Sequence, residues 1–115
     1  MIIIEGRVPC HAKVIRRFVK WMNKSYPMRR KVVIHIHKDA ELAHKEKNEF
    51  TLYGLYTNQH IRVALGALDE TMSLIVIGHE LGHAQQDFTK MPLSEPYADH
   101  FAVGCVLLFR GSEKK

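Results

Sequence analysis

The spacing of apolar residues changes near Asp69, and this change constrains the fold more than any other feature of the sequence. Before it, "KVVIHIHK" (31–38) and "HIRVAL" (60–65) alternate apolar and polar side chains, the period of a half-buried strand. After it, "MSLIVIGHELGHAQQDF" (72–88) and "SEPYADHFAVGCVLLF" (94–109) have the longer period of helices. The chain is therefore expected to combine a sheet with a helical C-terminal part.

The remaining elements complete an α+β chain in the order strand, helix, three strands, two helices. The apolar stripe of "PCHAKVIRRFVKWMNKSYP" predicts a helix opened by Pro9 and ended before Pro27. Asp69 or Thr71 is expected to cap the next helix and Ser94 the last one, which Gly111 and the charged tail should close. We predict a single domain over residues 1–115, with a small, twisted, partly antiparallel mixed sheet. Further strands are predicted for "MIIIEG" (1–6) and "EFTLYGLYT" (49–57), the latter followed by a turn at Asn58.

Composition is that of a globular chain. Of the 115 residues, 46% are hydrophobic and 25% charged. The apolar runs are too short for a membrane span or a signal-peptide core, so we expect a cytoplasmic protein with no membrane partner. Cys10 and Cys105 lack the spacing of a zinc site, and free thiols are favoured over a disulfide.

Charge is unevenly distributed, with a net value of +5. Residues 1–47 hold twelve Lys and Arg against four Asp and Glu, whereas residues 48–115 hold five against eight. The basic face from Lys13 to Lys24 could contact phosphates of a nucleic acid. More often such a row keeps the outer side of an amphipathic helix in water, and that interpretation is favoured.

The motif "HELGH" (79–83) carries the clearest chemical signal. On a helix, His79 and His83 lie only about 40° apart and one turn along, so both imidazoles can face one ion. Glu80 flanks the same space and is placed to act as a general base on a metal-activated water, as in HExxH metalloproteases. Gly82 is a poor helix former, which a close approach by another element would explain.

A catalytic zinc needs a third protein ligand, with the fourth position left to water. The downstream candidates are Asp87, Glu95, Asp99 and His100. Positions 95 and 99 share one helix face, and His100 lies about 100° off it, which disfavours a three-histidine site.

"HELGH" followed by "EPYADHFA" resembles the gluzincin pattern, and in particular the ImmA/IrrE-like metallopeptidases, over about residues 70–109. The resemblance implies a minimal zincin-like domain with a two-helix zinc unit and one Zn²⁺ per chain. It implies that Glu95 is the third ligand and that Asp99 accepts the free imidazole N–H of His79 or His83, which would raise ligand basicity.

Further residues are candidates for contacts with the substrate or a second metal ion. "HIRVAL" is a candidate sheet edge for binding substrate by strand addition, and an ordinary interior strand is an equal alternative. For an oxyanion or substrate contact the candidates are Tyr97, His100, His60 and Tyr56, among which the sequence does not choose. His35 and His37 share a strand face; without a third partner they are interpreted as exposed strand histidines.

The expected function is zinc-dependent hydrolysis of a protein or peptide substrate. The alternative is a non-catalytic zinc-stabilised adaptor that binds nucleic acid or protein through the basic N-terminal half. A structural zinc site would fill all four positions with protein groups, whereas a catalytic one would keep a water.

Overall fold

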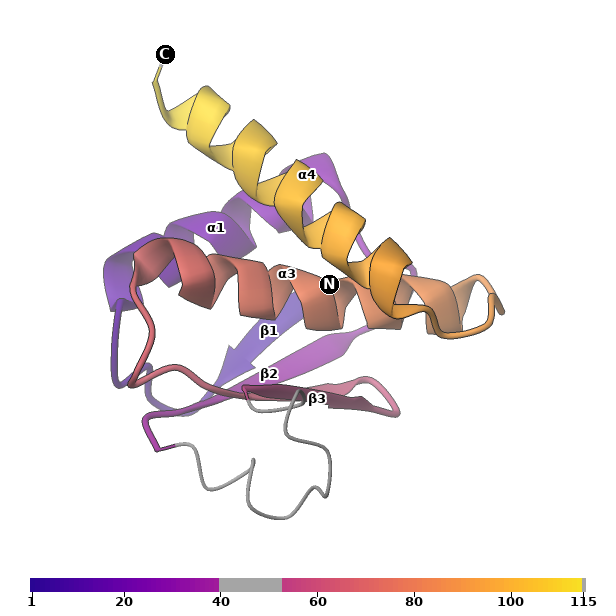
Figure 1. Ribbon diagram of the computed structural model, residues 1–115, viewed down its shortest axis with the longest axis horizontal. Coiled ribbons are helices and arrows are strands. Elements are labelled where there is room, and N and C mark those ends of the chain that lie inside the picture. Colours follow the sequence, from indigo (N-terminus) through magenta and orange to yellow (C-terminus); the bar gives the residue numbers. More distant parts are fainter. Residues whose placement is uncertain (40–52, 115) are drawn as a thin grey trace.

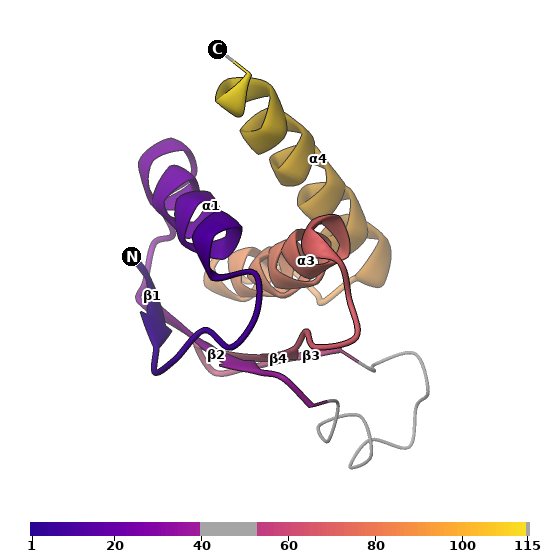
Figure 2. The same ribbon diagram turned by 90° about the vertical axis from the view of Figure 1, so that its left-hand side faces the viewer.

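The computed structural model describes residues 1–39 and 53–114. Within these ranges four strands form one mixed sheet, and the three helices lie on the same face of it (Figure 1, Figure 2). This architecture confirms the predicted α+β fold and, for the described residues, the predicted order of elements. The elements are β1 (Ile2–Glu5), α1 (Ala12–Ser25), β2 (Val32–His37), β3 (Gly54–Thr57), β4 (His60–Ala64), α3 (Glu70–Phe88) and α4 (Glu95–Glu113).

The sheet has the order β1-β2-β4-β3, in which β1, β2 and β4 are parallel and β3 is antiparallel to β4. The predicted turn joins β3 and β4: Asn58 and Gln59 both have positive φ, 46° and 71°, as two-residue hairpin turns require. Among the described residues, β4 is thus interior and β3 ends the sheet. Of the two alternatives left open for "HIRVAL", an edge or an interior strand, the structure has the interior strand, because the hairpin places β3 outside β4. Residues 49–52 of the predicted third strand lie outside the described ranges.

The helices bury one stripe each against the sheet and against one another. Phe18 of α1 contacts Phe109 of α4 with ring centroids 5.3 Å apart, so α1 and the C-terminal half of α4 close one end of the core. The basic residues of α1 face outward, as expected for an amphipathic helix. The buried stripe of α1 is Val14, Ile15, Phe18, Val19 and Met22.

One helix boundary, the start of α1, differs from the sequence prediction. α1 begins at Ala12 rather than near Pro9, because His11 has a left-handed φ of 53° that cannot continue a helix. α4 ends at Glu113, within the charged tail that was predicted to close it, and the Glu113 carboxylate lies 2.6 Å from the Arg17 guanidinium of α1. Asp69 and Ser94 cap α3 and α4 as predicted, each accepting a backbone N–H with its side chain.

Two further expectations concern cysteines and membranes. Cys10 and Cys105 are unpaired, which confirms free thiols; Cys105 is buried and Cys10 only partly so. In the described ranges, no helix is both long and apolar enough to cross a bilayer.

Candidate metal centre

Helix α3 presents the two histidines of the motif on one face. Its N-terminus is fixed by the Asp69 cap, and its buried residues, Leu74, Ile77 and Leu81 among them, face the core. His79 and His83 lie one turn apart, and their rings touch edge to face with centroids 4.7 Å apart. The helix therefore brings both imidazoles to one place, as the spacing predicted.

A close crossing of α3 and α4 brings the acidic residues of α4 to these histidines. A Cβ on Gly78 would lie 3.0 Å from Cα of Ala102, and a Cβ on Gly82 would lie 3.0 Å from Cα of Ala98. The two glycines of α3 therefore let the backbones approach where any larger residue would push them apart. The close approach predicted from Gly82 is confirmed.

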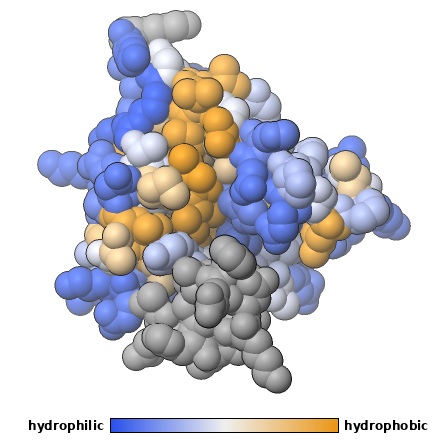
Figure 3. Space-filling model, viewed as in Figure 1, coloured by the Kyte–Doolittle hydropathy of each residue, from blue (hydrophilic) through white to orange (hydrophobic). Residues whose placement is uncertain are grey.

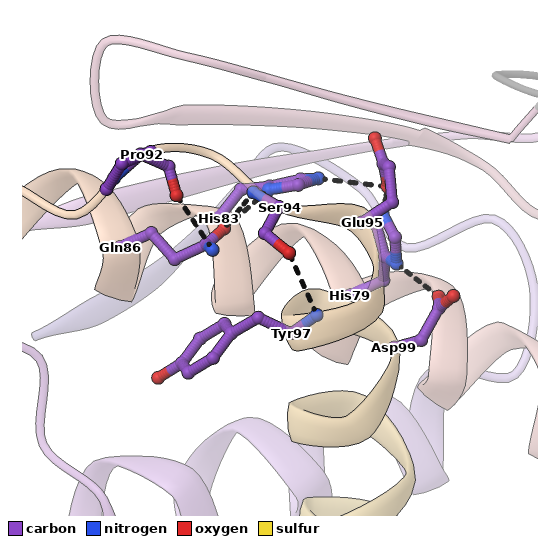
Figure 4. Close-up of polar contacts among 8 residues, drawn as sticks. All are labelled: His79, His83, Gln86, Pro92, Ser94, Glu95, Tyr97 and Asp99. Carbon is purple, nitrogen blue, oxygen red and sulfur yellow. Dashed lines mark hydrogen bonds and ion pairs between the residues drawn. The ribbon is translucent and has the colours of Figure 1, made fainter.

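The crossing places Glu95, in the first turn of α4, against both histidines (Figure 4). Its Oε2 lies 2.7 Å from Nε2 of His79 and 3.3 Å from Nε2 of His83. The three side chains offer donor atoms that all lie within 4.8 Å of one another, so they could hold a metal ion. In the described part of the chain this is the only group of three such residues.

Asp99 fixes the orientation of His79. One helical turn beyond Glu95, its Oδ1 lies 2.7 Å from Nδ1 of His79. A carboxylate at Nδ1 holds the N–H on that nitrogen and leaves the lone pair on Nε2, the atom that faces Glu95. Of the two histidines that the sequence left open, Asp99 thus contacts His79.

Gln86 fixes the orientation of His83, a role that was not predicted from the sequence. Its Oε1 lies 3.0 Å from Nδ1 of His83 and accepts the N–H of Ser94 at 3.3 Å, while its Nε2 donates to the Pro92 carbonyl at 3.2 Å (Figure 4). Because Oε1 can only accept, Nδ1 of His83 must donate, which leaves Nε2 for a metal. The side chain of Gln86 is completely buried. In the sequence, its position three residues after His83, about one helical turn, could have indicated this role.

Glu80 is buried between α3 and β3. Only 6% of the residue is exposed, and a Cβ on Gly54 of β3 would lie 2.7 Å from its Oε2, so the glycine makes room for the carboxylate. Burial raises the pKa of Glu80 to about 7, although His79 and His83 lower it. A divalent cation nearby would lower this pKa further, since opposite charge favours the carboxylate.

A cleft of about 600 Å³ opens beside these residues. One wall is β3, and the other is α3 with its apolar residues Met72, Ile75 and Val76. On the same side of the molecule, apolar residues gather over α3 and α4 (Figure 3). His79, Glu80, His83, Glu95 and Asp99 all line the cleft, which therefore gives a peptide-sized molecule access to the histidines.

The structure separates the four candidates for an oxyanion or substrate contact. Tyr56 lines the cleft, but its hydroxyl donates to Asp87 at 2.6 Å. Tyr97 stacks on Phe101 and points away from the histidines (Figure 4). His100 is exposed on α4 and does not line the cleft. His60 contacts His35 instead, on the sheet face opposite the helices. Only Tyr56 is thus near the site.

The donor set suits a metal ion of the zinc type. Two imidazoles and one carboxylate are ligand types that zinc sites use, and the Asp99 carboxylate lies beside His79. Comparisons of the chain with protein-family models, with curated proteins and with solved structures found no match.

Proposed function

We propose that the protein is a zinc-dependent metallopeptidase of the gluzincin type. The observation that carries this proposal is the convergence of His79 Nε2, His83 Nε2 and Glu95 Oε2 in a cleft that the buried carboxylate of Glu80 also lines. Three protein donors leave the fourth position of a tetrahedral ion to water or substrate, as catalytic zinc sites do.

The metal is assigned as zinc from its ligands. Two imidazoles and one carboxylate form a set that zinc binds well, with Asp99 and Gln86 fixing the imidazole tautomers. When bound, zinc supplies a Lewis acid that polarises a carbonyl and lowers the pKa of a coordinated water toward neutrality.

Glu80 is the general base in this proposal. It accepts a proton from the attacking water and passes it to the leaving amine, which becomes a neutral product. Its carboxylate is buried beside Gly54, so few competing water molecules reach it and its position relative to the two histidines is held by packing.

Strand β3 is the proposed substrate-binding edge. It ends the sheet among the described residues and forms one wall of the cleft. An extended peptide laid along β3 would gain main-chain hydrogen bonds and place its side chains against Met72, Ile75 and Val76 of the opposite wall. β4, the candidate edge from the sequence, is an interior strand.

The test is cleavage of a peptide library derived from a digested proteome, with new N-termini identified by mass spectrometry. The zinc-loaded wild type should cleave, and Glu80→Gln should bind zinc equally well but lose about 100-fold or more in rate. Glu70→Gln, an exposed glutamate on the same helix, is the matched control and should keep full activity. Equal cleavage by Glu80→Gln, or none by the zinc-loaded wild type, would contradict the proposal.

The second candidate is a zinc-stabilised adaptor that uses the basic N-terminal half. It is favoured by the exposure of Lys13, Arg16, Lys20 and Lys24 along one helix. An adaptor should bind generic DNA with an affinity that falls steeply with salt, and should do so unchanged in Glu80→Gln. DNA binding by a protein without peptidase activity would favour this candidate.

A further inference from the structure

The sheet face opposite the helices carries a pair of histidines from adjacent strands. No helix of the described residues covers this face (Figure 2). In the register of β2 and β4, Val33 is paired with His60 and His35 with Arg62, so His35 and His60 are diagonal neighbours on it. Nε2 of His35 lies 3.3 Å from Nδ1 of His60. From the sequence, His35 and His37 were interpreted as exposed strand histidines; in the structure His35 is half-buried and its imidazole contacts His60.

We infer that His35 and His60 form a second metal site, for a divalent ion that prefers imidazole, such as Zn²⁺, Ni²⁺ or Cu²⁺. Two imidazole nitrogens bound to one tetrahedral zinc at about 2.0–2.1 Å lie about 3.3–3.4 Å apart. The observed nitrogen separation of 3.3 Å already matches this value. The ion would replace the proton that the two nitrogens share in their hydrogen bond.

The strands fix the two rings relative to each other, and the surroundings of His35 favour its neutral form. The rings lie nearly parallel, at 18° with centroids 5.5 Å apart, on strands whose backbones are hydrogen-bonded to each other. Burial and the charge of Arg62 lower the pKa of His35, and a neutral imidazole is the form that binds metal. Arg62 also repels a cation, while Glu5, opposite His35 on β1, attracts one.

Two protein ligands make a weaker and more accessible site than three. His60 is exposed and His35 half-buried, so water or a donor group from another molecule can fill the remaining positions. The ion at this site should therefore exchange readily and be lost on dialysis, in contrast to an ion held by His79, His83 and Glu95.

The site is tested by zinc titration in a background that lacks the first site, His79→Ala/His83→Ala. Calorimetry should show one weak binding event, and His35→Ala or His60→Ala should each reduce its affinity by at least about tenfold, or 1.4 kcal/mol. His37→Ala, on the same strand face, is the matched control and should leave the affinity unchanged. Absence of binding, or binding unaffected by His60→Ala, would overturn the inference.

A second readout does not depend on the stability of that background. With one equivalent of zinc already bound to the wild type, further zinc should shift the imidazole NMR signals of His35 and His60 and leave those of His37 in place. Shifts confined to other histidines would overturn the assignment. Because the readout is metal binding on the opposite face of the sheet, the result is independent of peptidase activity.

Discussion

Gln86 offers the sharpest perturbation of the metal centre, because it orients His83 from a position where it cannot touch the ion or the substrate. Gln86→Ala removes three hydrogen bonds, to His83, Ser94 and Pro92. At about 1 kcal/mol each, their loss predicts that the free energy of unfolding falls by about 3 kcal/mol. Freed of its acceptor, the His83 ring should also bind zinc about 10–100-fold more weakly.

Two measurements separate these effects. Urea unfolding in the presence of a chelator gives the stability of the zinc-free protein, and competition with a chromophoric chelator gives the zinc affinity. Gln86→Glu keeps an acceptor for His83 but cannot donate to the Pro92 carbonyl, so it should regain zinc affinity relative to Gln86→Ala while remaining less stable than the wild type. Gln85→Ala is the matched control, since the Gln85 side chain is only partly buried. Zinc affinity of Gln86→Ala within twofold of the wild type would refute the orienting role.

Three further substitutions probe the other contacts of the site. Gly82→Ala should separate α3 from α4 and lower the free energy of unfolding in urea by about 1–3 kcal/mol. Gly104→Ala is the control: its Cβ would meet nothing within 4 Å, so it should raise the free energy of unfolding by up to about 1 kcal/mol. Equal effects of the two substitutions would refute the close crossing. Asp99→Ala should weaken zinc binding about 10-fold in the chelator competition. Unchanged zinc affinity would show that Asp99 does not support His79 as a ligand. Gly54→Ala should displace the Glu80 carboxylate and lower the cleavage rate without changing the zinc content. A cleavage rate equal to that of the wild type would contradict this, because it would mean that Glu80 tolerates the added methyl group.

Much of the fold followed from local patterns that the structure retains. The alternation around Ile34 and Ile61 and the caps at Asp69 and Ser94 depend on neighbouring residues alone, and each was predicted. Gly82 also signalled its role, because a glycine inside a helix is costly unless another element must come close.

The errors concern pairings between distant residues. Strand order depends on how the β3–β4 hairpin docks on β2, which periodicity does not encode. The sequence therefore did not decide between an edge and an interior position for β4, and it left His60 among the four candidates for a substrate contact. Gln86 was missed because its hydrogen bonds to Pro92 and Ser94 exist only once the loop folds back.

The zinc content of the protein tests the central claim most directly. Protein purified without added metal or chelator, dialysed and analysed by elemental methods, should retain one zinc per chain, because three protein ligands hold it. His79→Ala/His83→Ala, prepared in the same way, should retain none, since the two-ligand pair His35 and His60 releases its ion on dialysis. A wild type that retains no zinc and takes up none at the His79 and His83 site when zinc is added would contradict the metal centre and the peptidase with it.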